Sequence, residues 1–289
     1  MHELNQHKIA ALLPPRRAQS NKGSYGSVAA VAGSLAYRGA AALCVEGALR
    51  TGAGLVYLAS VEPVIQLVLT RTPECCALPC RTDADGGILA ADAAAVRQRF
   101  TEKPAVLLAG PGLGPSAARI LNALLTADAK WKAAVLDADA LNALAAGELG
   151  QFPLLPTNTV LTPHPGEAAR LLGCSVAQIQ ADRPAAAQEL AERYGCVAVL
   201  KGSGTLIAAP GREMLHNPTG NPGLARGGSG DVLAGMLAQG LAPFDAAACA
   251  VWLHGAAADR CAARTSQLTM LPHDILTDLA DVVGEIERK

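Results

Sequence analysis

AVLLAGPGLGPSAARILNALLTAD, residues 105–128, joins a short apolar run, a glycine-rich turn and a segment with helical spacing. The run at 105–110 is almost wholly apolar, which is typical of a parallel strand covered on both faces. Apolar residues then recur with the period of a helix from Ser116 onward. Three glycines at 110–114 permit a tight turn between the two. The stretch therefore predicts a strand, a turn and a helix.

The same unit recurs along the chain. Buried strands are expected at residues 27–33, 54–60, 105–110, 133–139, 159–163 and 196–202, and helices at 39–52, 116–128, 167–173 and 183–195. Strand and helix in alternation predict an α/β fold, with a mainly parallel central sheet, right-handed crossovers and helices on both faces.

Two segments depart from this alternation. TLIAAPGREMLH, residues 205–216, contains two short apolar runs about a Pro-Gly turn and is expected to form a hairpin on the same sheet. Residues 70–88 show neither a continuous apolar run nor helical spacing, and they are interpreted as an irregular excursion. Because no linker or repeat interrupts the chain, residues 1–289 are expected to form a single domain.

Composition narrows the class of protein. Apolar residues make up 51% of the chain and charged residues 17%, as in a compact globular protein. The net charge of −1 argues against partners such as nucleic acid or a membrane surface. No apolar run has transmembrane length and the N-terminus lacks the order of a signal peptide, so a cytoplasmic location is expected.

The eight cysteines do not resemble a disulfide framework or a zinc site. Five of them are scattered through apolar segments, where cysteine acts as a small hydrophobic residue. Cys75, Cys76 and Cys80 are clustered but lack the paired spacing of zinc ligands. All eight are expected to be reduced and structural.

Polar and glycine-rich clusters follow the predicted strands. They lie at residues 33–34, 110–114, 137–142, 162–167 and 201–205. Ligands of such sheets bind at the carboxyl ends of the strands, so one site is expected there. Neither a P-loop nor a G-x-G-x-x-G fingerprint is present. For the glycines of GPGLG, a tight turn and contact with a ligand both remain open.

GNPGLARGGSGDVLAG, residues 220–235, places a glycine-rich loop before an apolar helix. The first N–H groups of such a helix are unpaired and favour an anion, most often phosphate. We define Gly228, Ser229 and Gly230 as the anion turn. Asp231 beside it can accept the proton of a hydroxyl that attacks a phosphoryl group. An ordinary N-cap aspartate is the alternative.

This segment resembles the G-x-G-D region of the ribokinase-like superfamily, and further motifs resemble one family within it, the ADP-dependent NAD(P)H-hydrate dehydratases. The motifs occur in order over most of the chain: KGSYGSVAAVAGS (22–34), YRGAAALCVEGALRTGAGLVYLA (37–59), AGPGLG (109–114), VLDADALNAL (135–144), LTPHPGEAARLLG (161–173), VLKGSGTLIA (199–208) and the GGSGD region. Because the chain starts almost at the first motif, no fused epimerase domain is expected.

The resemblance implies repair of a damaged cofactor. Such an enzyme dehydrates the S-epimer of hydrated NADH or NADPH with ADP as co-substrate, and releases NAD(P)H, AMP and phosphate. It also implies Mg²⁺, a homotetramer, and a separate epimerase acting upstream. Preference between hydrated NADH and NADPH, and between ADP and ATP as donor, is not readable from the sequence.

The resemblance also assigns residues to roles. Asp231 would be the catalytic base and a substrate contact. Ala40, His164, and Gly112 or Gly114 would contact the hydrated nicotinamide nucleotide. Glu167 would be a magnesium partner through water, with no direct protein ligand. The residues that would bind the adenine nucleotide are Lys201, Gly202, Ser203, Gly204, Thr205 and Gly230.

Some residues keep more than one interpretation. Asp137 and Asp139 are either paired carboxylates near the nucleotide or a cap and a turn. Arg226 either contacts phosphate or points to solvent. His254 is interpreted as a core or interface residue. The reading His-Pro-Gly-Glu at 164–167, where related kinases carry Asn-x-x-Glu, favours the dehydratase.

Two other functions stay open. One is a kinase of the same superfamily that phosphorylates a vitamin-precursor alcohol with ATP. The other is a catalytically silent nucleotide-binding protein.

Overall fold

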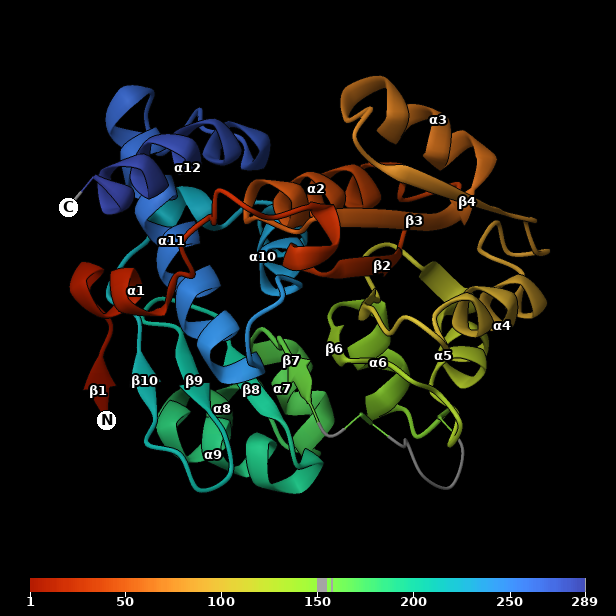
Figure 1. Ribbon diagram of the computed structural model, residues 1–289. Coiled ribbons are helices and arrows are strands. Elements are labelled where there is room, and N and C mark those ends of the chain that lie inside the picture. Colours follow the sequence, from red (N-terminus) through yellow and green to blue (C-terminus); the bar gives the residue numbers. More distant parts are fainter. Residues whose placement is uncertain (150–154, 157, 289) are drawn as a thin grey trace.

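The strands pair into a ten-stranded sheet in the computed structural model, which describes residues 1–149, 155–156 and 158–288 (Figure 1). Their order across the sheet is β1-β10-β9-β8-β7-β6-β5-β2-β3-β4. The bounds are β1 His2–Glu3, β2 Ser27–Val31, β3 Leu55–Val61, β4 Cys76–Cys80, β5 Val106–Ala109, β6 Ala133–Leu136, β7 Thr159–Leu161, β8 Val197–Leu200, β9 Leu206–Ala208 and β10 Leu215–His216.

The central strands are parallel and buried. β4, β3, β2, β5, β6, β7 and β8 pair in parallel, and β9 is antiparallel to both β8 and β10. Every residue of β5, β6, β7 and β8 is buried, as expected of strands covered on both faces. The predicted α/β class and the predicted hairpin are confirmed.

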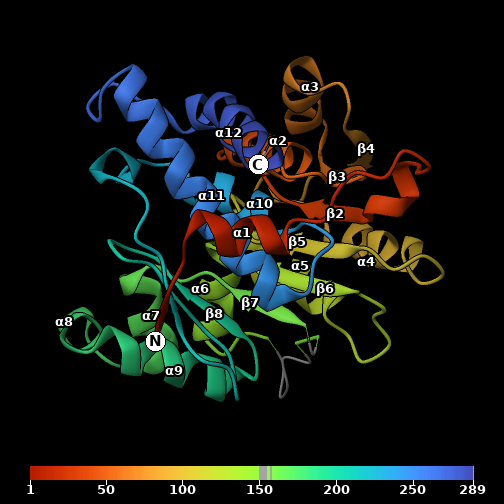
Figure 2. The same cartoon turned by 60° about the vertical axis from the view of Figure 1, so that its left-hand side comes forward.

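Helices cover both faces of this sheet (Figures 1 and 2). Helices α4 to α9 pack on one another along one face, while α1, α2, α3, α10, α11 and α12 form the other layer. Their bounds are α1 Gln6–Leu12, α2 Arg38–Arg50, α3 Glu62–Arg71, α4 Ala90–Arg99, α5 Ala117–Leu124, α6 Asp139–Ala145, α7 Pro165–Leu172, α8 Val176–Ala181, α9 Arg183–Tyr194, α10 Ser229–Leu237, α11 Pro243–Arg264 and α12 Pro272–Glu287. None of the described helices combines the length and apolar character needed to cross a membrane.

The interpretation of residues 70–88 as an irregular excursion is wrong in part. Strand β4 lies inside that stretch and pairs in parallel with β3 at the edge of the sheet. An edge strand is covered on fewer sides, and most of β4 is only half-buried. It therefore lacks the continuous apolar run that identified the central strands. All eight cysteines have free thiols, as expected.

Helices α2 and α10 approach each other unusually closely. A Cβ atom added to Gly235 of α10 would lie 2.0 Å from the carbonyl oxygen of Cys44 in α2. One added to Gly47 of α2 would lie 2.7 Å from the carbonyl oxygen of Val232. Both obstacles are backbone atoms, which cannot turn aside. The two glycines therefore set the distance between α2 and the helix that carries Asp231.

We predict that Gly235→Ala lowers the free energy of unfolding by about 3 kcal/mol, because the added methyl must push the two helices apart. Gly39→Ala in α2 is the matched control. Its added Cβ meets nothing within 4 Å, so the better helix propensity of alanine should leave stability unchanged or about 0.5 kcal/mol higher. Urea denaturation of both variants measures this, and equal stabilities would contradict the close approach.

Candidate active site

The carboxyl ends of β2, β5, β6, β7 and β8 lie at one end of the sheet, and the loops that follow them carry most of the predicted site residues. β5 to β8 are consecutive neighbours in the sheet, so their loops are adjacent as well. The start of α10 lies against this end, since Gly230 is close to side chains from two of the loops.

A buried ion pair lies at the centre of the site. Nζ of Lys201, after β8, donates a hydrogen bond to Oδ1 of Asp137, after β6, at 2.8 Å. The hydroxyl of Thr162, after β7, donates to the same oxygen at 2.7 Å. Oε2 of Glu167 is 3.8 Å from Nζ. Burial alone would lower the pKa of Lys201, but these two carboxylates outweigh it and raise that pKa.

The anion turn meets this ion pair. A Cβ at Gly230 would lie 3.3 Å from Nζ of Lys201 and 3.7 Å from Oδ2 of Asp137. Gly228 is the N-cap residue of α10, with φ of 99°, and no side chain caps the helix. The first N–H groups of α10 are therefore not occupied by a capping side chain, and a cation lies beside them, as an anion site requires. The hydroxyl of Ser229 is buried without a hydrogen-bond partner among the described residues.

Asp231 is the third residue of α10 and not its N-cap, so the interpretation as an ordinary capping aspartate is wrong. Its pKa is raised to about 7, first by burial and then by the negative charge of Asp137. Lys201 opposes this rise, and Asp139 adds to it. A carboxylate with a pKa near neutrality is suited to accept a proton at physiological pH.

The predicted substrate residues of α2 and the GPGLG loop are neighbours. A Cβ at Gly112 would lie 3.0 Å from Cβ of Ala40 and 2.8 Å from Cβ of Tyr37. Gly112 also has φ of 65°, so both space and backbone require glycine there. The N–H of Gly114 donates to Oδ2 of Asp139 at 2.8 Å. Contact of either glycine with substrate stays a prediction.

His164 and Glu167 form a reciprocal cap on α7. Nδ1 of His164 accepts from the N–H groups of Gly166 and Glu167 at 3.0 and 3.3 Å, and Oε2 of Glu167 accepts from the N–H of His164 at 2.8 Å. Burial, then the charges of Lys201 and Arg170, lower the pKa of His164. The imidazole is therefore neutral near pH 7, with its proton on Nε2, and half of the side chain is exposed.

Asp137 and Asp139, which the sequence left without a role, both reach the site. Asp137 accepts from Lys201, and Asp139 accepts from the loop that contains Gly114. Ala138 between them has φ of 51° and ψ of −115°, a conformation that strains any residue with a Cβ. The strained residue thus lies between two carboxylates that reach the same site.

We predict that Ala138→Gly raises the free energy of unfolding by about 1 kcal/mol, since glycine adopts this conformation without strain. Ala140→Gly, in the helix that follows, is the control and should lower it by about 1 kcal/mol. Thermal unfolding of both variants tests this. A loss of stability in Ala138→Gly would show that the backbone there is not strained.

Four other residues are placed by their contacts or their exposure. The hydroxyl of Thr205 donates to the carbonyl of Gly202 at 3.0 Å, and Ser203 is exposed in the same loop. Arg226 is exposed and donates to the carbonyl of Leu268 at 2.7 Å, and its contact with phosphate stays a prediction. His254 is buried in α11, which confirms it as a core residue.

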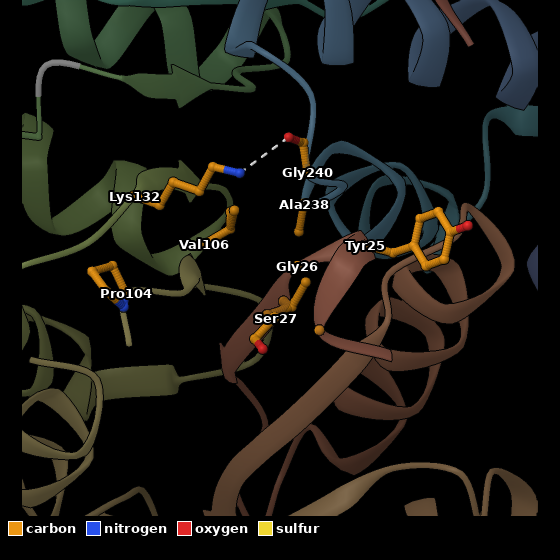
Figure 3. Close-up of a pocket in the computed structure, with 10 residues that line it drawn as sticks. Tyr25, Gly26, Ser27, Pro104, Val106, Lys132, Ala238 and Gly240 are labelled. Carbon is orange, nitrogen blue, oxygen red and sulfur yellow. Dashed lines mark hydrogen bonds between the residues drawn. The ribbon is translucent and has the colours of Figure 1, made fainter. Parts of the chain in front are cut away.

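A separate pocket of about 210 Å³ lies at the opposite ends of the strands (Figure 3). Ser27, Pro104, Val106 and Lys132 line it, near the amino ends of β2, β5 and β6. Lys132 turns toward the carbonyl of Gly240, to which it donates at 3.3 Å. No carboxylate or histidine lines this pocket. The predicted site residues that follow the strands lie at the other end of the sheet.

Comparison with known families shows which family this chain belongs to. The family model described as NAD(P)H-hydrate dehydratase matches residues 28–280, a range that includes every predicted site residue. The chain belongs to this family.

Relatives carry matching names. A bifunctional NAD(P)H-hydrate repair enzyme Nnr from Moorella thermoacetica is 42% identical over 96% of this chain and 53% of its own length. An ADP-dependent (S)-NAD(P)H-hydrate dehydratase from Neisseria meningitidis is 41% identical over 84% of this chain and 80% of its own. The chain spans about half the length of the bifunctional relatives it matches.

Solved structures share the fold. An ADP/ATP-dependent NAD(P)H-hydrate dehydratase from Bacillus subtilis, co-crystallised with ATP and Mg²⁺, is 34% identical, with a TM-score of 0.81 over 98% of this chain and 97% of its own. A ribokinase-like superfamily protein from Enterococcus faecalis has a TM-score of 0.85 at 28% identity, over 99% of this chain and 96% of its own. The ribokinase-like fold is thus confirmed.

Proposed function

We propose that this protein dehydrates the S-epimer of hydrated NADH or NADPH, with ADP as co-substrate, and yields NAD(P)H, AMP and phosphate. The observation that carries the proposal is the meeting of Asp231, the anion turn and Lys201 at one end of the sheet. The dehydratase names of the family and of the relatives support this reaction over a small-alcohol kinase.

The first step is phosphoryl transfer. Asp231 accepts the proton of the ring hydroxyl as its oxygen attacks the β-phosphorus of ADP, and AMP leaves with the bridging oxygen. The N–H of Ser229 already donates to the carbonyl of Arg226 at 3.3 Å. The N–H groups of the two glycines of the anion turn and the ammonium group of Lys201 stabilise the charge that develops on the phosphoryl oxygens. In the second step the lone pair of the ring nitrogen expels phosphate from the adjacent carbon to give an iminium ion. Loss of a proton from the next ring carbon to water then restores the double bond of NAD(P)H.

The two substrates occupy two parts of the site. We assign the hydrated nicotinamide nucleotide to Ala40, His164, and Gly112 or Gly114, and ADP to residues 201–205 with Gly230. The neutral imidazole of His164 supports this assignment, because its Nδ1 is occupied by the N–H groups of Gly166 and Glu167 and its Nε2–H, 3.5 Å from Oε1 of Glu167, is on a half-exposed side chain that can turn to a polar group of the substrate. Asp231 lies where both substrates must meet.

Mg²⁺ fits the site as a partner of the nucleotide. Glu167 has one oxygen committed to the N–H of His164, and its other oxygen is 3.5 Å from Nε2 of the same residue. That second oxygen can accept a hydrogen bond from a water of Mg²⁺, which commonly keeps several waters and binds substrate phosphates. The ion, when bound, neutralises phosphate charge.

The proposal also covers the domain organisation, the oligomeric state, the partner enzyme and the location. We propose a single domain over residues 1–289, a homotetramer, and a separate epimerase that supplies the S-epimer. The word bifunctional in the relatives' names is consistent with a second activity alongside dehydration. The free thiols of all eight cysteines support a cytoplasmic location.

The deciding experiment mixes the protein with hydrated NADH, Mg²⁺ and either ADP or ATP, and follows the return of NADH absorbance. Recovery with ADP, with AMP and phosphate formed in equal amounts, supports the proposal. Recovery only with ATP would identify ATP, and not ADP, as the phosphoryl donor. No recovery, together with phosphorylation of a small alcohol and no release of phosphate, would establish the kinase instead.

Asp231→Asn is expected to lower kcat by about a hundredfold or more, because the amide cannot accept the proton. Its affinity for ADP, measured by calorimetry, should change little. Turnover near that of the wild type would remove Asp231 as the base. Binding without turnover in both proteins would indicate the silent nucleotide-binding protein.

The dependence of kcat/KM on pH is expected to rise through about pH 7, because Asp231 must be ionised to act and its pKa is about 7. Asp137→Asn removes a negative neighbour, so the pKa of Asp231 falls and the rising limb moves to lower pH. Asp139→Asn should move the rising limb in the same direction by a smaller amount. An unchanged midpoint in Asp137→Asn would contradict the coupling.

A further inference from the structure

Arg183 is bonded to the loop that is proposed to hold the nucleotide. We call residues 201–205 the nucleotide loop. Arg183 begins α9, and its Nη2 donates to the carbonyls of Leu200 and Gly204 at 3.2 and 3.3 Å. Its Nη1 donates to the carbonyl of Lys201 at 3.4 Å. One planar guanidinium group thus donates hydrogen bonds to carbonyls at both ends of the loop.

The nucleotide loop is also confined by its contacts. Gly202 has φ of 142°, and a Cβ there would lie 2.7 Å from Nη1 of Arg183. Gly204 is confined by a different element, because a Cβ there would lie 2.7 Å from Nε2 of His216 at the end of β10. The loop therefore runs between Arg183 and His216 with no room for a side chain at either glycine.

The charge of Arg183 is not neutralised by a nearby carboxylate. Among the described residues, none places a carboxylate oxygen within 4.0 Å of its guanidinium nitrogens. The adjacent Asp182 is engaged elsewhere, since its Oδ1 accepts from the N–H of Ala185 at 3.0 Å. Arg183 is half-buried, and a half-buried cation with only neutral partners attracts anions more strongly than an exposed one.

We propose that Arg183 is a positioning residue for the adenine nucleotide: it holds the nucleotide loop in its binding shape through three backbone carbonyls, and its uncompensated charge favours the phosphates of ADP. This inference rests on the proposed function, because it assumes that the loop binds ADP. It concerns ADP alone, since the residues assigned to the hydrated nicotinamide nucleotide lie on other loops.

Three variants separate the effect of the loop's shape from the effect of the charge of Arg183. Arg183→Lys keeps the charge but cannot make the three bonds, and Arg183→Gln loses the charge. Arg193→Lys is the matched control. Arg193 lies on the same helix and also donates to a carbonyl, that of Leu171 at 3.2 Å, away from the nucleotide loop.

The measurements are the Kd of ADP by calorimetry at low and high salt, and the KM values of ADP and hydrated NADH. We expect Arg183→Lys to bind ADP about tenfold more weakly, and Arg183→Gln about thirtyfold more weakly with a smaller dependence on salt. The KM of hydrated NADH should stay within about twofold. Arg193→Lys should match the wild type in every measurement, and thermal unfolding verifies that each variant is folded.

Two results would overturn the inference. In one, Arg183→Lys and Arg183→Gln bind ADP as the wild type does. In the other, the KM values of ADP and hydrated NADH rise equally, as a general loosening of the fold would cause. The proposed function fails separately, if the wild type neither binds ADP nor turns over hydrated NADH.

Discussion

The ion pair between Lys201 and Asp137 connects the parts of the site. These residues follow β8 and β6, which flank β7 in the sheet, and Thr162 after β7 donates to the same carboxylate oxygen. Three strand ends are thereby fixed to one another. Removal of one partner from a buried pair leaves an uncompensated charge, which commonly costs 3–5 kcal/mol. The pair thus combines a structural role with an electrostatic one.

The electrostatic role concerns Asp231. The negative charge of Asp137 raises the pKa of Asp231, and the positive charge of Lys201 lowers it. Burial, the largest cause, makes the net shift of that pKa upward. The same ammonium group that restrains this rise lies beside the anion turn. A single pair of side chains therefore adjusts the proton affinity of the proposed base, which burial raises, and contributes to the attraction for phosphate.

Glycines and strain complete the geometry. The close approach of α2 and α10 fixes the helix that carries Asp231 against the helix that carries Ala40, and Ala40 in turn lies against Gly112. Ala138 has a strained backbone between Asp137 and Asp139, which both reach the site. These features lower the freedom of the site before any substrate binds, which favours a reaction that depends on positioning.

The sequence by itself determined the alternation of strands and helices, because apolar runs and helical spacing are local properties. It also predicted the anion turn, since a cluster of glycines before an apolar helix leaves the first N–H groups of that helix unpaired. It did not identify β4, whose edge position depends on β3. Only the tertiary structure decided the contacts of Asp137 and Arg183 and the direction in which the pKa of Asp231 is shifted. Those depend on burial and on charges from distant parts of the chain, which meet only when the sheet has formed.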